Sequence, residues 1–170
     1  MNVSNVVKGF TFALGSTLLI SYIMVSAFAG RFEALQDEEA LFYIFINAPS
    51  EELMFRFAVP LVLMYVFKCG YLSAGIMSSV LFGVAHYWSY EANVFMMVIA
   101  IMGGIIYALT VYFFSQKEPF NFDDGLLAAM LAHAGYNSVI TYCSESIFFI
   151  GLACLLVFAI LHFLVKGMEE

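Results

Sequence analysis

Charged residues are scarce in this chain. Only 11% of its 170 residues are Asp, Glu, Lys or Arg, whereas 64% are hydrophobic. Soluble domains typically have about 25% charged and about 45–50% apolar residues. A core of this size cannot hide so much apolar surface, which excludes a soluble monomer and a disordered chain. The net charge of −7 also excludes the basic surface that binding of nucleic acid requires. The apolar residues must therefore face membrane lipid.

Cysteine and the common hydrolase motifs are also scarce or missing. The three cysteines, Cys69, Cys143 and Cys154, are scattered among apolar residues with no Cys-x-x-Cys spacing, which argues against a disulfide framework or a cysteine zinc site. No His-Glu-x-x-His sequence occurs, so the helix of the common zinc proteases is absent. No Ser or Cys stands in a recognisable nucleophile motif.

Long apolar stretches dominate what is present. A membrane-spanning helix needs about 20 apolar residues, and lipid requires each span to satisfy its own backbone hydrogen bonds as a helix. The six stretches are Gly9–Gly30, Ala40–Phe67, Tyr71–His86, Ala92–Ser115, Gly125–Cys143 and Ser146–Val165. With no internal repeat or long linker, the sequence predicts an all-α, polytopic transmembrane helical bundle of about six spans. We expect one integral membrane domain over residues 1–170.

The distribution of Lys and Arg between the stretches predicts the orientation in the membrane. Lys8, Lys68, Lys117 and Lys166 fall on one side, and only Arg31 falls on the other. Cytoplasmic loops carry the excess of positive charge, so both termini are expected in the cytoplasm. The first apolar run exceeds the about 7–15 residues of a signal-peptide core, and we expect it to be retained as a span.

The second stretch contains three ionisable residues, Glu51, Glu52 and Arg56. Each such group in a bilayer costs about 2.5–3.5 kcal/mol on insertion scales and is usually functional. Glu52 and Arg56 are four residues apart on one helix face and can pair, which leaves Glu51 available for chemistry. Pro49 predicts a kink or a fresh helix start just before them. The alternative is a structural ion pair beside an interfacial carboxylate.

The third stretch ends at His86. Phe82 lies one helical turn earlier and can shield the imidazole from lipid. On an adjacent face, Gly75, Ser79 and Gly83 form a row of small residues that lets a neighbouring helix approach closely. Taken alone, His86 could instead be a residue of the aromatic belt at the membrane interface.

The fifth stretch carries His133 and Asn137, again four residues apart, on a polar stripe of an otherwise apolar helix. Asn offers donors and an acceptor, and His offers a base or a donor. The alternative is a hydrogen-bond clamp between helices. His162, near the end of the sixth stretch, has no polar partner at helical spacing, and we expect it to lie outside any site.

Together these residues favour hydrolysis without a covalent intermediate. A carboxylate can activate water, imidazoles can assist, and a His/Asn pair can donate to an oxyanion.

The three motifs resemble the signature of the CPBP family, the CAAX-protease and bacteriocin-processing intramembrane proteases, which includes the Ras-converting CAAX endopeptidase. The matching elements are Glu51-Glu52-x-x-x-Arg56, Phe82-x-x-x-His86 and His133-x-x-x-Asn137, in that order, within about residues 46–140. The resemblance implies an all-helical intramembrane endopeptidase. It implies a CAAX-type substrate, or a peptide or bacteriocin precursor, with or without a prenyl group.

By this resemblance, Glu51 and His86 would activate the water, and His133 and Asn137 would form the oxyanion site. Glu52, Arg56 and Phe82 would support them. The expected mechanism uses no metal. Zinc held by Glu51, His86 and His133 is the alternative, because the ligand types suit it.

Two other functions are compatible with the sequence. One is a non-catalytic membrane immunity or scaffold protein that keeps the same fold. The other is a transporter or a haem-binding helical bundle, because two membrane histidines could ligate haem. The missing inverted repeat argues against a transporter.

Overall fold

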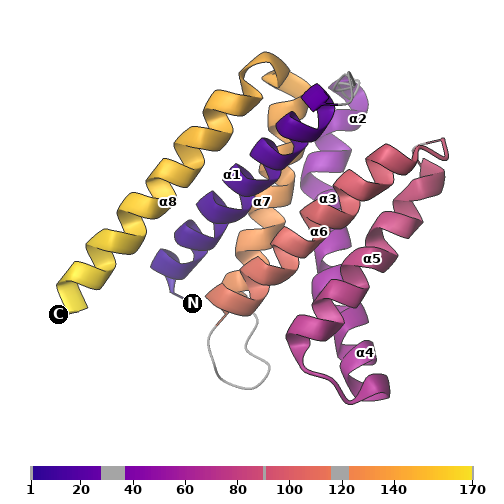
Figure 1. Ribbon diagram of the computed structural model, residues 1–170, viewed down its shortest axis with the longest axis horizontal. Helices are drawn as coiled ribbons and strands as arrows, with labels where there is room; N and C mark the ends of the chain where they lie inside the picture. Colours follow the sequence, from indigo (N-terminus) through magenta and orange to yellow (C-terminus); the bar gives the residue numbers. More distant parts are fainter. Residues whose placement is uncertain (1, 28–36, 90, 116–122, 170) are drawn as a thin grey trace.

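The computed structural model describes residues 2–27, 37–89, 91–115 and 123–169, and every regular element in these ranges is helical (Figure 1). The elements in chain order are α1 (Val3–Ala27), α2 (Asp37–Phe42), η1 (Tyr43–Asn47), α3 (Ala48–Glu52), η2 (Leu53–Ala58), α4 (Val59–Phe67), α5 (Tyr71–Ser89), α6 (Val94–Phe114), α7 (Asp123–Tyr142), η3 (Ser144–Ser146) and α8 (Ile147–Glu169). The segments η1 and η2 are π-helical, and η3 is a short 3₁₀ turn. The predicted all-α fold is confirmed.

The six predicted stretches correspond to six helical rods, because α2 to α4 form one continuous rod from Glu39 to Phe67. By length and composition, α1, α6 and the segment Ser144–Phe163 can each cross a membrane. The α2–α4 rod and α5, bent by 119° at their junction, add a fourth crossing if they count as one broken span. The α2–α4 rod, α5 and α7 contain the polar site residues, which lower their mean hydropathy. The count of six crossings stays a prediction.

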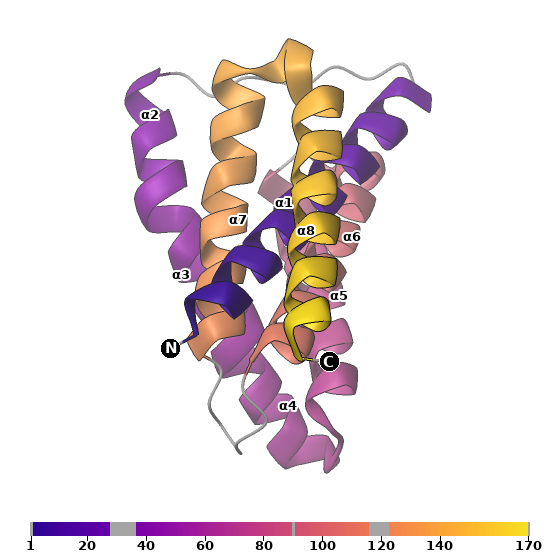
Figure 2. The same ribbon diagram turned by 90° about the vertical axis from the view of Figure 1, so that its left-hand side faces the viewer.

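The core lies where α1, α6, α7 and α8 meet. Leu18 of α1, Val111 of α6, Ala132 of α7 and Ile147 of α8 belong to one cluster of fully buried apolar side chains. Figures 1 and 2 show α1 between α8 and α7, with α5 and the α2–α4 rod on the far side of α6 and α7. This arrangement leaves the rod in contact with both α5 and α7, the two helices that carry the predicted histidines.

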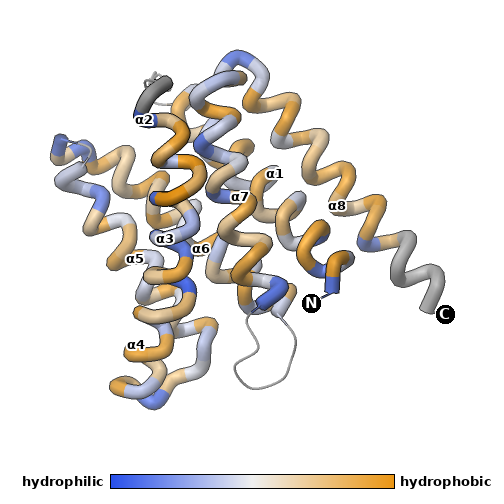
Figure 3. Tube along the Cα trace, turned by 180° about the vertical axis from the view of Figure 1, so that it is seen from behind, coloured by the Kyte–Doolittle hydropathy of each residue, from blue (hydrophilic) through white to orange (hydrophobic). Residues whose placement is uncertain are grey.

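Apolar side chains cover much of the outer surface, as a lipid environment requires. Phe45 is 68% exposed, Tyr65 is 76% exposed and Phe163 is 71% exposed. In Figure 3 hydrophilic positions gather at the ends of the helices, and a further group interrupts the apolar α2–α4 rod at and beyond α3. The hydrophilic positions within the rod therefore fall on the segment that carries Glu51, Glu52 and Arg56.

The rod does not begin afresh at Pro49, so that alternative from the sequence is wrong. Ala48 has helical dihedral angles, φ −59° and ψ −48°, and its N–H donates to the carbonyl of Tyr43, five residues earlier. The same five-residue hydrogen bond precedes Pro60, where the N–H of Val59 donates to the carbonyl of Met54. A π-helical turn widens the helix just before each proline, so the ring is accommodated without ending the helix.

Both termini lie at the same end of the bundle, where the turn between α4 and α5 also lies (Figure 1). The backbone N–H of Asn2 donates to both carboxylate oxygens of the buried Asp124, at 2.9 and 3.0 Å, which ties the start of α1 to the start of α7. Arg31 and Lys117 lie outside the described residues. The cytoplasmic location of this end stays a prediction.

The row of small residues on α5 contacts α6, as the sequence predicts. A Cβ added at Gly75 would lie 3.1 Å from Ala108 Cβ. A Cβ added at Gly83 would lie 2.9 Å from the carbonyl of Met97 and would collide with the side chain of Ile101. The two helices approach so closely that no larger residue fits at Gly83.

We expect Gly83→Ala to destabilise the protein, because the new methyl group meets backbone that cannot move aside. Overpacking of this kind costs about 1–3 kcal/mol, which corresponds to a fall in Tm of at least about 2 °C in detergent. Gly70→Ala is the matched control, since a Cβ there meets nothing within 4 Å. Equal Tm values for both variants would contradict this packing.

Candidate active site

The structure brings the three motifs together around Glu51. Its Oε1 lies 3.6 Å from Nε2 of His86 on α5, and its Oε2 lies 3.8 Å from Nε2 of His133 on α7. The side chains of Glu51, His86 and His133 are 19%, 17% and 10% exposed, so the cluster is sheltered but accessible. Three helices far apart in the sequence therefore converge on one carboxylate.

The predicted pair of Glu52 and Arg56 is present and fully buried. Arg56 Nε lies 3.2 Å from Glu52 Oε2, and both side chains have 0% exposure. The guanidinium also donates to the carbonyl of Phe55 at 3.0 Å and lies over the ring of Phe82, 5.1 Å from its centroid. The other carboxylate oxygen of Glu52 lies 2.9 Å from Nδ1 of His133. Glu52 thus connects the buried cation to a histidine of the site.

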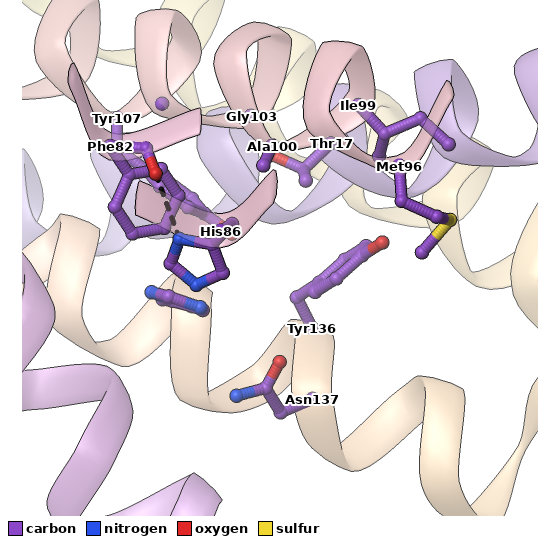
Figure 4. Close-up of a pocket in the computed structure, with 12 residues that line it drawn as sticks. Thr17, Phe82, His86, Met96, Ile99, Ala100, Gly103, Tyr107, Tyr136 and Asn137 are labelled. Atoms are coloured by element: carbon purple, nitrogen blue, oxygen red, sulfur yellow. Dashed lines mark hydrogen bonds between the residues drawn. The ribbon is translucent and has the colours of Figure 1, made fainter. Parts of the chain in front are cut away.

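Hydrogen bonding at Nδ1 orients both imidazoles. Nδ1 of His86 lies 2.9 Å from the carbonyl of Phe82, which can only accept, so this nitrogen carries a proton (Figure 4). Nδ1 of His133 likewise faces the carboxylate of Glu52, which accepts. In each ring the other nitrogen, Nε2, is therefore the one presented to Glu51. Two imidazole Nε2 atoms and a carboxylate converge on one small volume.

Phe82 walls off His86, as predicted. The two rings lie 4.2 Å apart between centroids, and Phe82 is only 4% exposed. Phe82 also contacts the ring of His133 edge-on, with centroids 6.2 Å apart. One phenyl ring therefore packs against both histidines and the guanidinium of Arg56.

Asn137 lies one turn beyond His133 and donates through Nδ2 to the carbonyl of Tyr43 at 3.4 Å. An amide carries two N–H groups, and this contact uses one of them. Asn137 lines the same cavity as His86 and His133, which measures about 70 Å³.

His162, which the sequence predicts to lie outside the site, is found between the rings of Phe158 and Phe163 on α8.

Sequence reasoning missed two residues that contact the side chains of Glu51 and His133. Asn47 donates to Oε1 of Glu51 at 2.7 Å, and its position four residues before Glu51 was a readable signal. Tyr107 of α6 stacks on the ring of His133 with centroids 5.3 Å apart and is 2% exposed. No local pattern identifies Tyr107, because its contact depends on how α6 and α7 pack.

The π-helical segment η2 supplies backbone carbonyls that α5 binds. Ser78 Oγ donates to the carbonyl of Phe55 at 2.6 Å, and the hydroxyl of Tyr71 donates to the carbonyl of Arg56 at 2.9 Å. In a π-helical turn the backbone hydrogen bonds join residues five apart instead of four, and such turns are frequent at functional sites. These two bonds fix the carboxylate-bearing rod against the helix that carries His86.

Glu51, His86 and His133 are also the three residues that the sequence offers as ligands of a zinc ion. Within the described segments, no group of three or more His, Cys, Asp and Glu side chains is disposed to hold a metal ion. The Glu51 carboxylate oxygens lie 3.6 and 3.8 Å from the two Nε2 atoms. The metal-free mechanism and the zinc alternative both stay predictions.

Comparison with known proteins identifies the family. Residues 39–139 match the family described as Type II CAAX prenyl endopeptidase Rce1-like. The chain belongs to this family. The match covers the rod, α5, α6 and most of α7, and it confirms the resemblance found in the motifs. No curated protein and no solved structure matches the chain. At the level of this CAAX endopeptidase family, the protein is an integral membrane protease with a peptide or protein substrate.

We expect Glu52→Gln to destabilise the protein strongly, because it leaves the fully buried Arg56 without its counter-charge. Breaking one side of a buried ion pair costs about 3–5 kcal/mol. Glu51→Gln is the matched control, since its side chain keeps the contact with Asn47 and pairs with no buried guanidinium. Thermal unfolding of both variants in detergent checks this, and a larger loss for Glu51→Gln would contradict it.

Proposed function

We propose that the protein is an intramembrane endopeptidase in which Glu51, assisted by His86, activates a water molecule that hydrolyses a peptide bond. The observation that carries the proposal is the convergence of two imidazole Nε2 atoms on the two oxygens of Glu51. A water molecule beside this cluster can bond to a carboxylate oxygen and to a ring nitrogen together. Both groups then draw a proton from it as its oxygen attacks.

The same cavity contains donors for the negative charge that develops on the carbonyl oxygen. The remaining N–H of the Asn137 amide is one donor, and His133 is the other when it carries a proton on Nε2 as well as Nδ1. The carboxylate of Glu52 accepts from Nδ1 at 2.9 Å and holds the ring in this orientation. Placed donors of this kind account for large rate effects in acyl transfer.

Protons balance over the reaction as follows. Glu51 accepts a proton when the water oxygen bonds to the carbonyl carbon, and the tetrahedral intermediate bears its negative charge toward His133 and Asn137. Collapse of this intermediate breaks the carbon–nitrogen bond. The proton passes from Glu51, directly or through His86, to the departing amine, and both groups return to their starting states.

The substrate classes that fit are a CAAX-type protein tail, with or without a prenyl group, and a membrane-associated peptide such as a bacteriocin precursor. The family supports the first. Exposed apolar side chains around the bundle would let a lipid-anchored or membrane-inserted substrate approach from the bilayer.

We expect Glu51→Gln to abolish cleavage while the protein stays folded, because an amide cannot accept the proton of water. The assay uses purified protein in detergent with quenched peptides that include a prenylated CAAX peptide. Glu145→Gln is the matched control, since Glu145 is exposed on η3. Wild-type activity should also resist a chelator, and loss that zinc restores would establish the metal alternative.

Retained activity in Glu51→Gln would contradict the role of Glu51. Absence of cleavage by the wild type across the panel would count against the enzyme and favour the immunity or scaffold protein. In that case the cellular phenotype should survive Glu51→Gln and His133→Ala. A purified protein with a Soret band would favour haem binding.

We expect Asn137→Ala to lower kcat by about 10²–10³-fold with a much smaller change in KM, because the donor acts on the transition state. Steady-state kinetics on one cleaved peptide measures this. Ser138→Ala is the control on the same helix, because Ser138 Oγ bonds to the carbonyl of Ala134 at 2.8 Å. Equal kcat losses in both variants would indicate disturbance of α7 rather than loss of a donor.

A further inference from the structure

The carboxylate of Glu51 must keep one rotation for the proposed mechanism to work. Its Oε1 faces Nε2 of His86 and its Oε2 faces Nε2 of His133, at 3.6 and 3.8 Å. The last side-chain torsion of glutamate has a broad, roughly two-fold profile, so the side chain alone sets this rotation only loosely. A turn about that bond would take both oxygens away from the imidazoles. A neighbouring group must therefore hold the carboxylate.

Asn47 is a neighbour placed to hold it. Its Nδ2 donates to Oε1 of Glu51 at 2.7 Å, which is shorter than either contact with a histidine. A carboxylate can only accept, so the amide nitrogen is the atom that faces it. Hydrogen bonds to a carboxylate are also stronger than those between neutral groups. The bond fixes Oε1 and, because the carboxylate is planar, it fixes the direction of Oε2 as well.

Asn47 ends the π-helical segment η1, and this segment also contacts the other half of the proposed site. The N–H of Ala48 donates to the carbonyl of Tyr43 across the π turn. Nδ2 of Asn137 on α7 donates to the same carbonyl at 3.4 Å. One short segment therefore contacts the proposed base through Asn47 and a proposed oxyanion donor through Tyr43.

We propose that Asn47 is a positioning residue that holds the Glu51 carboxylate in the rotation from which it takes a proton from water. This inference rests on the proposed endopeptidase function and adds to it a residue that acts through Glu51 rather than on the substrate. With Oε1 held by Asn47, Oε2 keeps its direction toward His133. The amide neither gains nor loses a proton during hydrolysis, so its contribution is geometric.

A hydrogen bond between side chains four residues apart also occurs as a simple stabilising pair on a helix. Two observations favour positioning. Asn47 is half-buried and its acceptor is a carboxylate only 19% exposed, so the bond belongs to the sheltered cluster. The backbone of Asn47 is helical, with φ −67° and ψ −51°, and its side chain makes no capping bond to α3. The amide is therefore not needed to begin that helix.

The test compares three variants of the whole chain in detergent. Asn47→Leu keeps a side chain of similar size and removes the donor, whereas Asn47→Gln keeps the amide on a side chain that is one methylene longer. Ser50→Ala is the matched control, because Ser50 directly precedes Glu51 on the same rod and is exposed. Steady-state kcat and KM are measured on two peptides of different sequence, one of them a prenylated CAAX peptide. Tm is measured for every variant.

We expect Asn47→Leu to lower kcat by about 10–100-fold, because a misplaced reacting group costs up to about 10²-fold. KM should change by less than about twofold, since the ground-state contacts with the substrate are kept. The loss should be the same for both peptides, with Tm within about 2 °C of the wild type. Asn47→Gln should recover most of kcat, because its amide still reaches the carboxylate, and Ser50→Ala should keep the wild-type kcat.

Three results would overturn the role of Asn47 while leaving the proposed function intact. The first is a wild-type kcat in Asn47→Leu. The second is a loss of kcat that Asn47→Gln does not restore, or that falls in step with Tm, which would indicate a structural role. The third is a loss that differs between the two peptides, which would indicate contact with the substrate. Failure of the wild type to cleave either peptide would instead overturn the proposed function, and the role of Asn47 with it.

Discussion

The buried guanidinium of Arg56 is the constraint on which this structure depends. A cation with no exposure inside an apolar bundle needs an opposite charge and further polar or aromatic neighbours. Glu52 supplies the opposite charge, the carbonyl of Phe55 accepts a hydrogen bond, and the face of Phe82 covers the charge. These partners come from two helical rods, so the position of α5 against the α2–α4 rod is set by the need to surround one charge.

The same interaction determines the geometry of the site. Glu52 uses one oxygen for Arg56 and the other for Nδ1 of His133. The carboxylate that neutralises the cation therefore also fixes the orientation of the imidazole ring. Glu51, the next residue in the helix, then faces Nε2 of that ring. Adjacent carboxylates thus have different tasks because the helix directs them about 100° apart. One stabilises the interior, and the other remains accessible for chemistry.

Short-range spacing made much of this predictable. The helical fold follows from the length of the apolar stretches. The ion pair of Glu52 and Arg56 and the contact of Phe82 with His86 follow from a spacing of four residues on one helix. The meeting of Glu51 with two histidines was expected from chemical roles and family resemblance rather than from spacing.

Other features were not predictable. The π-helical turns that carry the rod through Pro49 and Pro60 were not foreseen, because local rules for proline assume an ordinary α-helix. They rule out the fresh helix start at Pro49, which was one of the two alternatives from the sequence. Tyr107 and Ser78 act through contacts between helices, which no pattern along one helix reveals.

The bond between Asn2 and Asp124 has a consequence for biosynthesis. The first helix leaves the ribosome long before the partner that anchors its start, 122 residues later in the chain. The helix that brings Asp124 also brings His133 and Asn137. A nascent chain that has inserted only its earlier helices therefore lacks both the anchor and two of the four proposed catalytic residues. In the proposed mechanism, the set of catalytic groups is complete only once this late helix is in place.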